Sequence, residues 1–156
     1  MKTTIMLAIA FLLPLTACTS TKNLQASADC HNIIKLDETA NNGFYLLDPN
    51  VKEPNKSTAV IVGKPLIRFE DIERVSLYPD EHDALDIYFT IDFEKGLKLS
   101  GVTQRRISEY MALVVNDKVV NVSQIQAAIG TSFYLNRLDS NEEANQIYLK
   151  IKCYIK

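Results

Sequence analysis

The sequence contains few of the residues from which an active site or a nucleic-acid surface is usually built. Only two of its 156 residues are histidine, which leaves little general-base capacity near neutral pH. It has no Gly-x-Ser-x-Gly element, no phosphate-cradling glycine loop and no calcium loop. Lysine and arginine number 17 against 19 acidic residues, without a basic stripe, so nucleic acid is not expected as a partner. These absences argue against an enzyme, and no cofactor is expected.

Long apolar runs are also missing, apart from one at the N-terminus. Lys2 precedes an almost wholly apolar run over residues 5–15. The run is shorter than the roughly 20 residues that a membrane-spanning helix needs, and it has the length of a signal-peptide core. The alternative is a buried N-terminal helix, but the run has no polar face and lies at the extreme N-terminus. We therefore expect a signal peptide.

The apolar run ends on Leu15-Thr16-Ala17-Cys18, which resembles the lipobox of bacterial lipoproteins. In that class a small residue such as Ala17 fits the peptidase cleft, and the thiol of Cys18 takes the lipid. Each buried CH₂ of an acyl chain, such as palmitate, contributes about 0.8 kcal/mol to membrane binding. Thr19, in place of the aspartate that commonly retains lipoproteins in the inner membrane, favours the outer membrane. The resemblance thus implies a lipid-anchored protein that faces the periplasm.

These features divide the chain into three parts. Residues 1–17 are the predicted signal peptide, Cys18 and the polar residues up to 29 form a flexible tether, and residues 30–156 form a single domain. Loss of Lys2 with the leader reduces the basic residues from 17 to 16 against 19 acids, a net charge of −3. A domain of about 127 residues is large enough for a hydrophobic core.

The two remaining cysteines, Cys30 and Cys153, flank nearly the whole predicted domain. Two thiols in an oxidising compartment allow a single disulfide. Two separate buried thiols are one alternative. A metal site that combines them with His31 and His82 is another, although none of the usual paired ligand spacings is present, and we expect no metal.

Hydrophobic periodicity predicts an α+β fold with an antiparallel sheet, helices packed on one face and ferredoxin-like character. The clearest strand is 85–93, in which apolar and polar residues alternate. Two apolar runs around Asn116-Asp117-Lys118 predict a hairpin. Ser140-Asn141-Glu142-Glu143 predicts a capping box in front of an amphipathic helix. The other expected elements are strands at 44–47, 59–62 and 132–138, a turn and then a strand within 70–77, an exposed turn at 78–83, and a helix over 97–110.

The second half of the chain resembles the head subdomain of the large periplasmic domain of SecD/SecDF, the protein-export subunits that assist the Sec translocon. The resemblance covers roughly residues 66–150. Its motifs are Phe93-Glu94-Lys95-Gly96, Thr103, residues 111–120 (MALVVNDKVV), Ile125, Ile129-Gly130 and Asn141-Glu142-Glu143-Ala144. The chain departs from the family pattern at residues 116–118, where Asp-Gly is common, and at 121–124, where a proline is common.

The resemblance implies a fold and a surface that meets extended polypeptide. It does not imply translocation, because the chain lacks the family's transmembrane helices. We therefore expect a lipid-anchored, non-catalytic binding module with a protein or peptide partner, which a sheet edge such as 132–138 could bind by strand addition. A small-ligand or inhibitor-type lipoprotein is the alternative, and a structural envelope protein without a ligand is a third reading. The sequence does not indicate the oligomeric state or the binding residues.

Two polar clusters remain as candidate sites. Asp80-Glu81-His82-Asp83 with Asp86 could bind a cation, although a solvated turn is the simpler interpretation. Arg105-Arg106, on the polar side of the predicted first helix, could bind an acidic group, but exposed arginines usually serve solubility.

Overall fold

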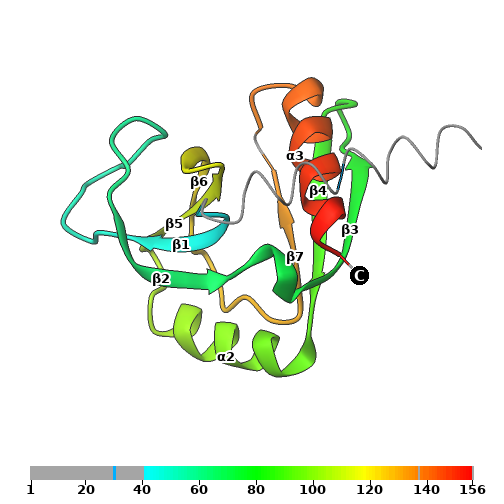
Figure 1. Cartoon of the computed structure of the whole chain (residues 1–156). Helices are drawn as coiled ribbons and strands as arrows, with labels where there is room; N and C mark the ends of the chain where they lie inside the picture. Colours follow the sequence, from blue (N-terminus) through cyan, green and yellow to red (C-terminus); the bar gives the residue numbers. More distant parts are fainter. Residues whose placement is uncertain (1–29, 31–40, 137, 156) are drawn as a thin grey trace, which may run out of the picture.

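The computed structural model describes residue 30 and residues 41–136 and 138–155, which form two antiparallel sheets, a 3₁₀ turn and two long helices (Figure 1). The first sheet has the strand order β2-β1-β5-β6, from β1 (Gly43–Leu47), β2 (Ile61–Ile67), β5 (Tyr110–Val115) and β6 (Lys118–Gln124). The second has the order β3-β4-β7, from β3 (Ile72–Pro79), β4 (Leu85–Ile91) and β7 (Ser132–Leu135). The predicted α+β class is confirmed, whereas the expected single sheet is in fact two. The predicted signal peptide, Cys18 and the tether lie outside the described residues.

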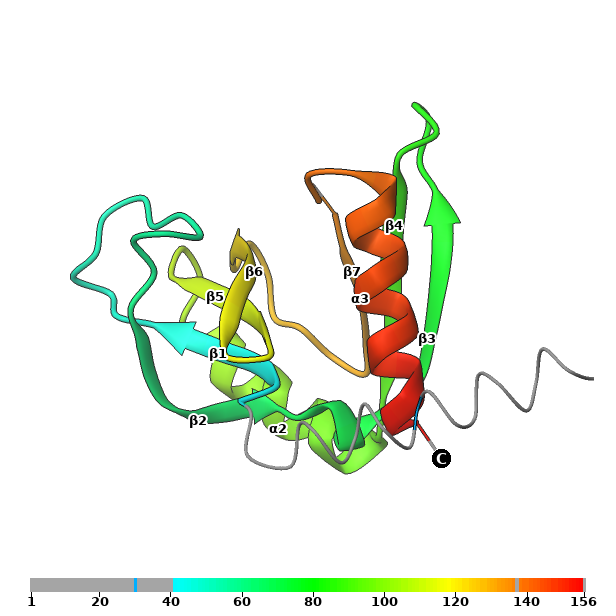
Figure 2. The same cartoon turned by 45° about the horizontal axis from the view of Figure 1, so that its top comes forward.

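The two helices cover different parts of the molecule (Figure 2). Helix α2 (Phe93–Gln104) lies beside the first sheet and contacts β2, while α3 (Asn141–Tyr154) packs on β3 and β4 of the second. The short turn η1 (Phe69–Asp71) connects β2 to β3. Among the described helices, none has the length and hydropathy that a membrane crossing requires.

The alternation predicted for 85–93 appears in β4, where Ile87, Phe89 and Ile91 are buried. The strand ends two residues earlier than expected because Asp92 caps α2 by accepting a hydrogen bond from the Lys95 amide at 3.1 Å. Phe93 therefore begins the helix and is 65% exposed instead of extending the strand.

Helix α2 also begins and ends before the predicted range of 97–110. Its buried positions are Gly96, Leu99 and Thr103, whereas Ile107 lies beyond the helix and is 51% exposed. Tyr110 opens β5. Only the first part of the predicted range is therefore helical, and the rest forms the turn that precedes β5.

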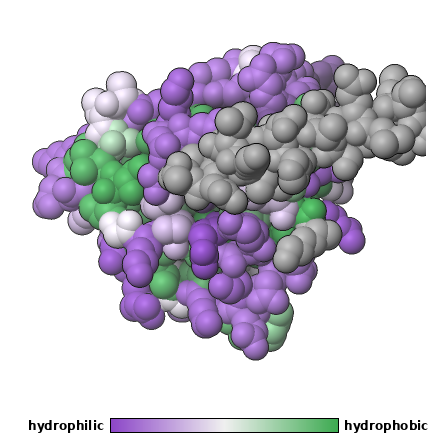
Figure 3. Space-filling view, viewed as in Figure 1, coloured by the Kyte–Doolittle hydropathy of each residue, from purple (hydrophilic) through white to green (hydrophobic). Residues whose placement is uncertain are grey.

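Strand β2 runs through Gly63-Lys64-Pro65, beyond the end of the strand predicted at 59–62. Pro65 is tolerated because β2 is an edge strand. A residue on the outer side of an edge strand does not need an N–H to bond a neighbouring strand. Gly63 has a φ of +72°, and the β1–β2 register is irregular nearby. The start of this strand exposes Ile61 and Val62, on the side where Figure 3 shows an apolar patch at the left.

The hairpin and the last helix form as predicted. Asn116 and Asp117 have φ values of +52° and +60°, the pattern of a type I′ turn between β5 and β6. The Ser140 hydroxyl accepts from the Glu143 amide at 3.1 Å at the start of α3. The Glu143 carboxylate accepts from the Asp139 amide, one residue before the cap, instead of from Ser140.

The boundaries of the other segments shift. β7 ends at Leu135 rather than at 138, and β3 takes in Tyr78 and Pro79, which were expected in a turn. These differences lie at element ends, where local pattern is least decisive.

One apolar core joins the two sheets. Phe44 of the first sheet meets Phe89 and Phe133 of the second edge-on, with ring centroids 5.3 and 5.2 Å apart. The core extends under α3 through Ala144 and Ile151, which are fully buried.

A disulfide joins Cys30 to Cys153 at the C-terminal end of α3, across 123 residues of sequence. This is the pairing that the two cysteines suggested. Since both sulfurs are in the bond, neither is available for the alternative metal site, and His31 lies outside the described residues.

Candidate functional site

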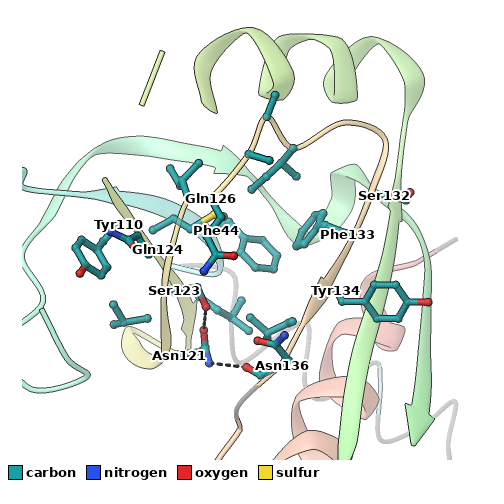
Figure 4. Close-up of a pocket in the computed structure, with 18 residues that line it drawn as sticks. Phe44, Tyr110, Asn121, Ser123, Gln124, Gln126, Ser132, Phe133, Tyr134 and Asn136 are labelled. Carbon is teal, nitrogen blue, oxygen red and sulfur yellow. Dashed lines mark hydrogen bonds between the residues drawn. The ribbon is translucent and has the colours of Figure 1, made fainter. Parts of the chain in front are cut away.

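A groove of about 540 Å³ lies between the first sheet and β7 of the second (Figure 4). Its walls come from β5, β6, β7 and the connection that runs from Ile125 to Thr131 between the last two strands. None of the 18 residues that line the groove is charged, although 23% of the chain is. The lining of the groove therefore carries no formal side-chain charge.

The two strands that flank the groove are both edge strands. β6 is the last strand of the first sheet and β7 the last strand of the second. Each has a strand partner on one side only among the described residues. Their free edges carry backbone groups that are available to another chain.

The backbone of β7 presents alternate residues to the free edge. The Ile91 amide donates to the Thr131 carbonyl at 2.9 Å, and the β4–β7 register continues from that pair without a bulge. Hydrogen-bonded positions alternate in an antiparallel pair, so Phe133 directs its N–H and C=O toward β4. Ser132 and Tyr134 direct theirs toward the free edge.

The same reasoning applies to β6. The Ile125 amide donates to the Glu109 carbonyl at 2.8 Å, which places the residue after the strand among the positions that face β5. The backbone groups of Val122 and Gln124 therefore face outward. The free edges of the two strands thus border one groove.

The two edges approach each other at one end of the groove. The side-chain nitrogen Nδ2 of Asn121 donates to the backbone carbonyl of Asn136 at 3.4 Å, and the Ser123 hydroxyl donates to the Asn121 side-chain oxygen at 2.7 Å. Asn121 is almost fully buried. Figure 4 shows this hydrogen-bonded chain at one end, with Gln124 and Ser132 far apart at the other.

Apolar side chains form the floor of the groove and amide and hydroxyl groups its rim. Figure 4 shows Phe133 directed toward Phe44, while Tyr134 points away from both. Leu113, Ile125 and Leu135 contribute to the apolar floor. The site can accept an apolar side chain and can hydrogen-bond a backbone, and no histidine or carboxylate is among the described residues that line it.

Two residues of α2 hold the 125–131 connection in place. The Thr103 hydroxyl is fully buried, donates to the Leu99 carbonyl at 2.9 Å and accepts from the Ile129 amide at 2.8 Å. Gly96 lies so close to Thr131 that a Cβ would come within 2.9 Å of the Thr131 Cα. These contacts fix the wall of the groove opposite the two edges.

The acidic cluster that the sequence indicated is a hairpin turn between β3 and β4. One carboxylate oxygen of Asp80 accepts hydrogen bonds from the backbone amides of His82 and Ala84 at 2.7 and 2.9 Å, so this oxygen stabilises the turn. Neither this cluster nor any other part of the described chain assembles three side chains that could hold a metal ion.

The two arginines do not form an anion site together. Arg106 pairs with Glu109 at 2.8 Å, and Arg105 terminates α2 as its C-cap. Sequence reasoning missed the groove residues Asn121 and Ser123. The available signal was the polar stretch 121–124, which was noted only as a departure from the family pattern.

Comparison with known proteins identifies the fold. The family described as SecDF, P1 head subdomain, matches residues 46–153. A structure of the membrane component SecDF that enhances protein export superposes with a TM-score of 0.62 at 17% identity, covering 91% of this chain and 71% of that one. No curated protein sequence gives a significant match.

Two longer SecDF structures show the same fold. The super-membrane-facing form of SecDF has a TM-score of 0.58 at 17% identity, over 86% of this chain and 21% of that one. SecDF from Thermus thermophilus, a translocon-associated membrane protein, has a TM-score of 0.50 at 26% identity, over 60% of this chain and 13% of that one. The chain thus covers only a minor part of these proteins.

Proposed function

The chain belongs to the SecDF P1 head subdomain family, and from this premise we propose that it is a non-catalytic binding module of the bacterial cell envelope. Its ligand is an extended polypeptide segment, which lies in the groove between β6 and β7. The observation that carries the proposal is that two unpartnered strand edges border one uncharged groove.

Strand addition is the mode of binding that this groove supports best. An inserted segment would hydrogen-bond to the outward backbone groups of Ser132 and Tyr134 on one side or of Val122 and Gln124 on the other. Strands in a sheet lie about 4.8 Å apart, and alternate side chains of the segment would point to the apolar floor. β7 is only four residues long, so we expect short contacts and weak, reversible capture.

The lining also defines which segments are accepted. Moving a charged side chain from water into a site without an oppositely charged partner costs several kcal/mol, and no lining residue is such a partner. The segment inside the groove is therefore uncharged. A small-ligand function is less well supported, because the strand edges offer a row of backbone groups instead of a few converging polar side chains.

We further propose that Cys18 anchors the protein by its lipid to the outer membrane, facing the periplasm. Cys30, which forms the disulfide, lies twelve positions after Cys18, and an extended chain of that length spans about 40 Å. Metabolic labelling with palmitate tests the anchor. We expect incorporation into the wild type and none into Cys18→Ala, which should leave the membrane fraction. Retention of the unlabelled variant in that fraction would contradict the proposal.

Photo-crosslinking from single positions tests the groove. A photoreactive residue at Gln126, an exposed groove residue, should crosslink to newly exported polypeptides in cells. The same residue at Gln104, exposed on α2 and outside the groove, is the matched control. Equal crosslinking from both positions would rule out the groove as the site.

A defined peptide gives the complementary test. We expect the full-length chain to bind a peptide of alternating valine and serine, and not the same peptide with glutamate at the valine positions, whose side chains would face the uncharged floor. Ser132→Pro should weaken binding, because it removes an N–H from the free edge without removing a β4–β7 ladder bond. Ser132→Ala keeps that N–H and should bind normally. Binding unaffected by the proline would overturn strand addition at β7.

A further inference from the structure

The second sheet has an outer face that no described element covers. Its inner face carries Phe89 and Phe133 and packs under α3 and Phe44. Because side chains alternate along a strand, the intervening residues point to the opposite side. There Tyr78 and Tyr134 are 47% and 56% exposed.

Three tyrosines, one from each strand, meet on this outer face. The register places Tyr88 opposite Tyr134 and Tyr78 opposite Asp86. The ring centroids of Tyr88 and Tyr134 are 4.7 Å apart, and those of Tyr78 and Tyr88 are 5.9 Å apart. We call Tyr78, Asp86, Tyr88 and Tyr134 the tyrosine face. Such a cluster exposes a continuous aromatic surface that a soluble protein rarely leaves open without a function.

Among the described residues, the charges on and beside the tyrosine face are mainly negative. The Asp86 carboxylate has no ion-pair or hydrogen-bond partner among the described residues, and burial together with the nearby Asp80 carboxylate raises its pKa. The one strand residue of opposite charge on this face is Arg74, which pairs with Thr90 toward the other end of the sheet. A cation placed between the rings and Asp86 would stabilise the ionised form of the Asp86 carboxylate.

We propose that the tyrosine face binds polypeptide segments that carry lysine or arginine. The cation lies over a tyrosine ring and pairs with Asp86. A glycan could also stack on the rings and donate hydroxyl hydrogen bonds to the carboxylate, but it would not neutralise the negative charge, so the charge favours the cationic segment. This surface shares Tyr134 with the groove, but the Tyr134 ring points away from Phe44 and Phe133 (Figure 4), and the groove itself is lined by uncharged residues and excludes charge.

The test uses a fluorescent glycine-serine peptide with four spaced lysines and its analogue with glutamine in their place. Anisotropy with the full-length chain should show binding of the lysine peptide only, and binding should weaken as salt is raised. Asp86→Asn and Tyr88→Leu should each reduce affinity about threefold or more. Glu94→Gln, which removes an exposed acid on α2 outside the tyrosine face, is the matched control and should bind as the wild type does.

Several outcomes would overturn the proposal. These are equal binding of the glutamine peptide, unchanged affinity in a folded Asp86→Asn protein, and preferential binding of a soluble cell-wall glycan fragment. Circular dichroism establishes folding for each variant. The Ser132→Pro groove variant separates the two proposals, since it should bind the lysine peptide normally even if the groove binds nothing.

Discussion

At the scale of single residues, the buried hydroxyl of Thr103 is the polar group on which the groove wall depends. It satisfies the Ile129 amide from inside the core. Thr103→Val keeps the shape and removes the acceptor, which leaves that N–H without its partner. We expect a loss of about 1–3 kcal/mol in the free energy of unfolding, measured by urea denaturation.

Thr103→Ser serves as the control for this prediction, since it retains the hydroxyl and should recover most of the stability. If the valine variant matched the wild type, the hydroxyl would not be holding the connection, and the groove wall would need another explanation.

Asp117 links the type I′ turn to the residues before β1. Its carboxylate accepts from the backbone and side-chain nitrogens of Asn41 at 2.8 and 2.7 Å, and these bonds lower its pKa. They also explain why an aspartate stands where glycine would suit the backbone better. A depressed pKa in the folded state stabilises the protein above the ordinary aspartate pKa of about 4.

That stabilisation is lost as the pH falls through the depressed pKa of Asp117. We expect Asp117→Asn to lower the melting temperature at pH 7, and the difference from the wild type to vanish at strongly acidic pH. Thermal melts across this range provide the measurement. A difference that persists at low pH would show that the charge is not the cause.

At the scale of elements, the sequence predicted most strands and both long helices, but not their assignment to sheets. Apolar residues alternate along β4, as at Ile87 and Phe89, and they recur on one side of α3 from Ala144 to Ile151. Sequence alone reveals these patterns, because the buried side of a strand or helix must be apolar. Which strands share a sheet, and how the sheets pack, depends on contacts between residues far apart in the sequence, such as Phe44 with Phe133. No local pattern encodes them.

The groove was beyond sequence reasoning for the same reason. The sequence suggests residues 132–138 as an edge for strand addition, and β7 is an edge strand of the second sheet, but the second edge, β6, becomes relevant only once the two sheets face each other. The polar residues Asn121 and Ser123 then acquire a role that their place in a predicted hairpin did not indicate.

Helix α2 offers a matched pair of glycines that separates packing from helix propensity. Gly96→Ala would bring a Cβ against the Thr131 backbone, so we expect destabilisation of about 1–3 kcal/mol in urea denaturation. Gly101→Ala meets only an arginine side-chain nitrogen, at 4.0 Å, and should stabilise by up to about 1 kcal/mol. Equal effects at the two positions would show that α2 does not press on the connection.

At the scale of the whole molecule, links far apart in sequence hold the two sheets and the N-terminal segment together. Besides the aromatic core, Lys56 between β1 and β2 pairs with Asp139 at 2.7 Å and with Glu143 at 3.0 Å near the start of α3. Such exposed pairs usually contribute 0–1 kcal/mol, so this link is secondary. The disulfide is the strongest constraint, because it closes nearly the whole folded chain into one loop.

The disulfide therefore provides the global test of stability. Its 123-residue separation predicts a stabilisation of about 5 kcal/mol if the cross-link acts by restricting the unfolded chain. Reduction of the wild type, or replacement by Cys30→Ser with Cys153→Ser, should lower the free energy of unfolding by a similar amount, while reductant should leave the double variant unchanged. If reduction did not affect the wild type, the two sheets and α3 would be stable without the link, and the bond would serve only to fix where the N-terminal segment leaves the domain.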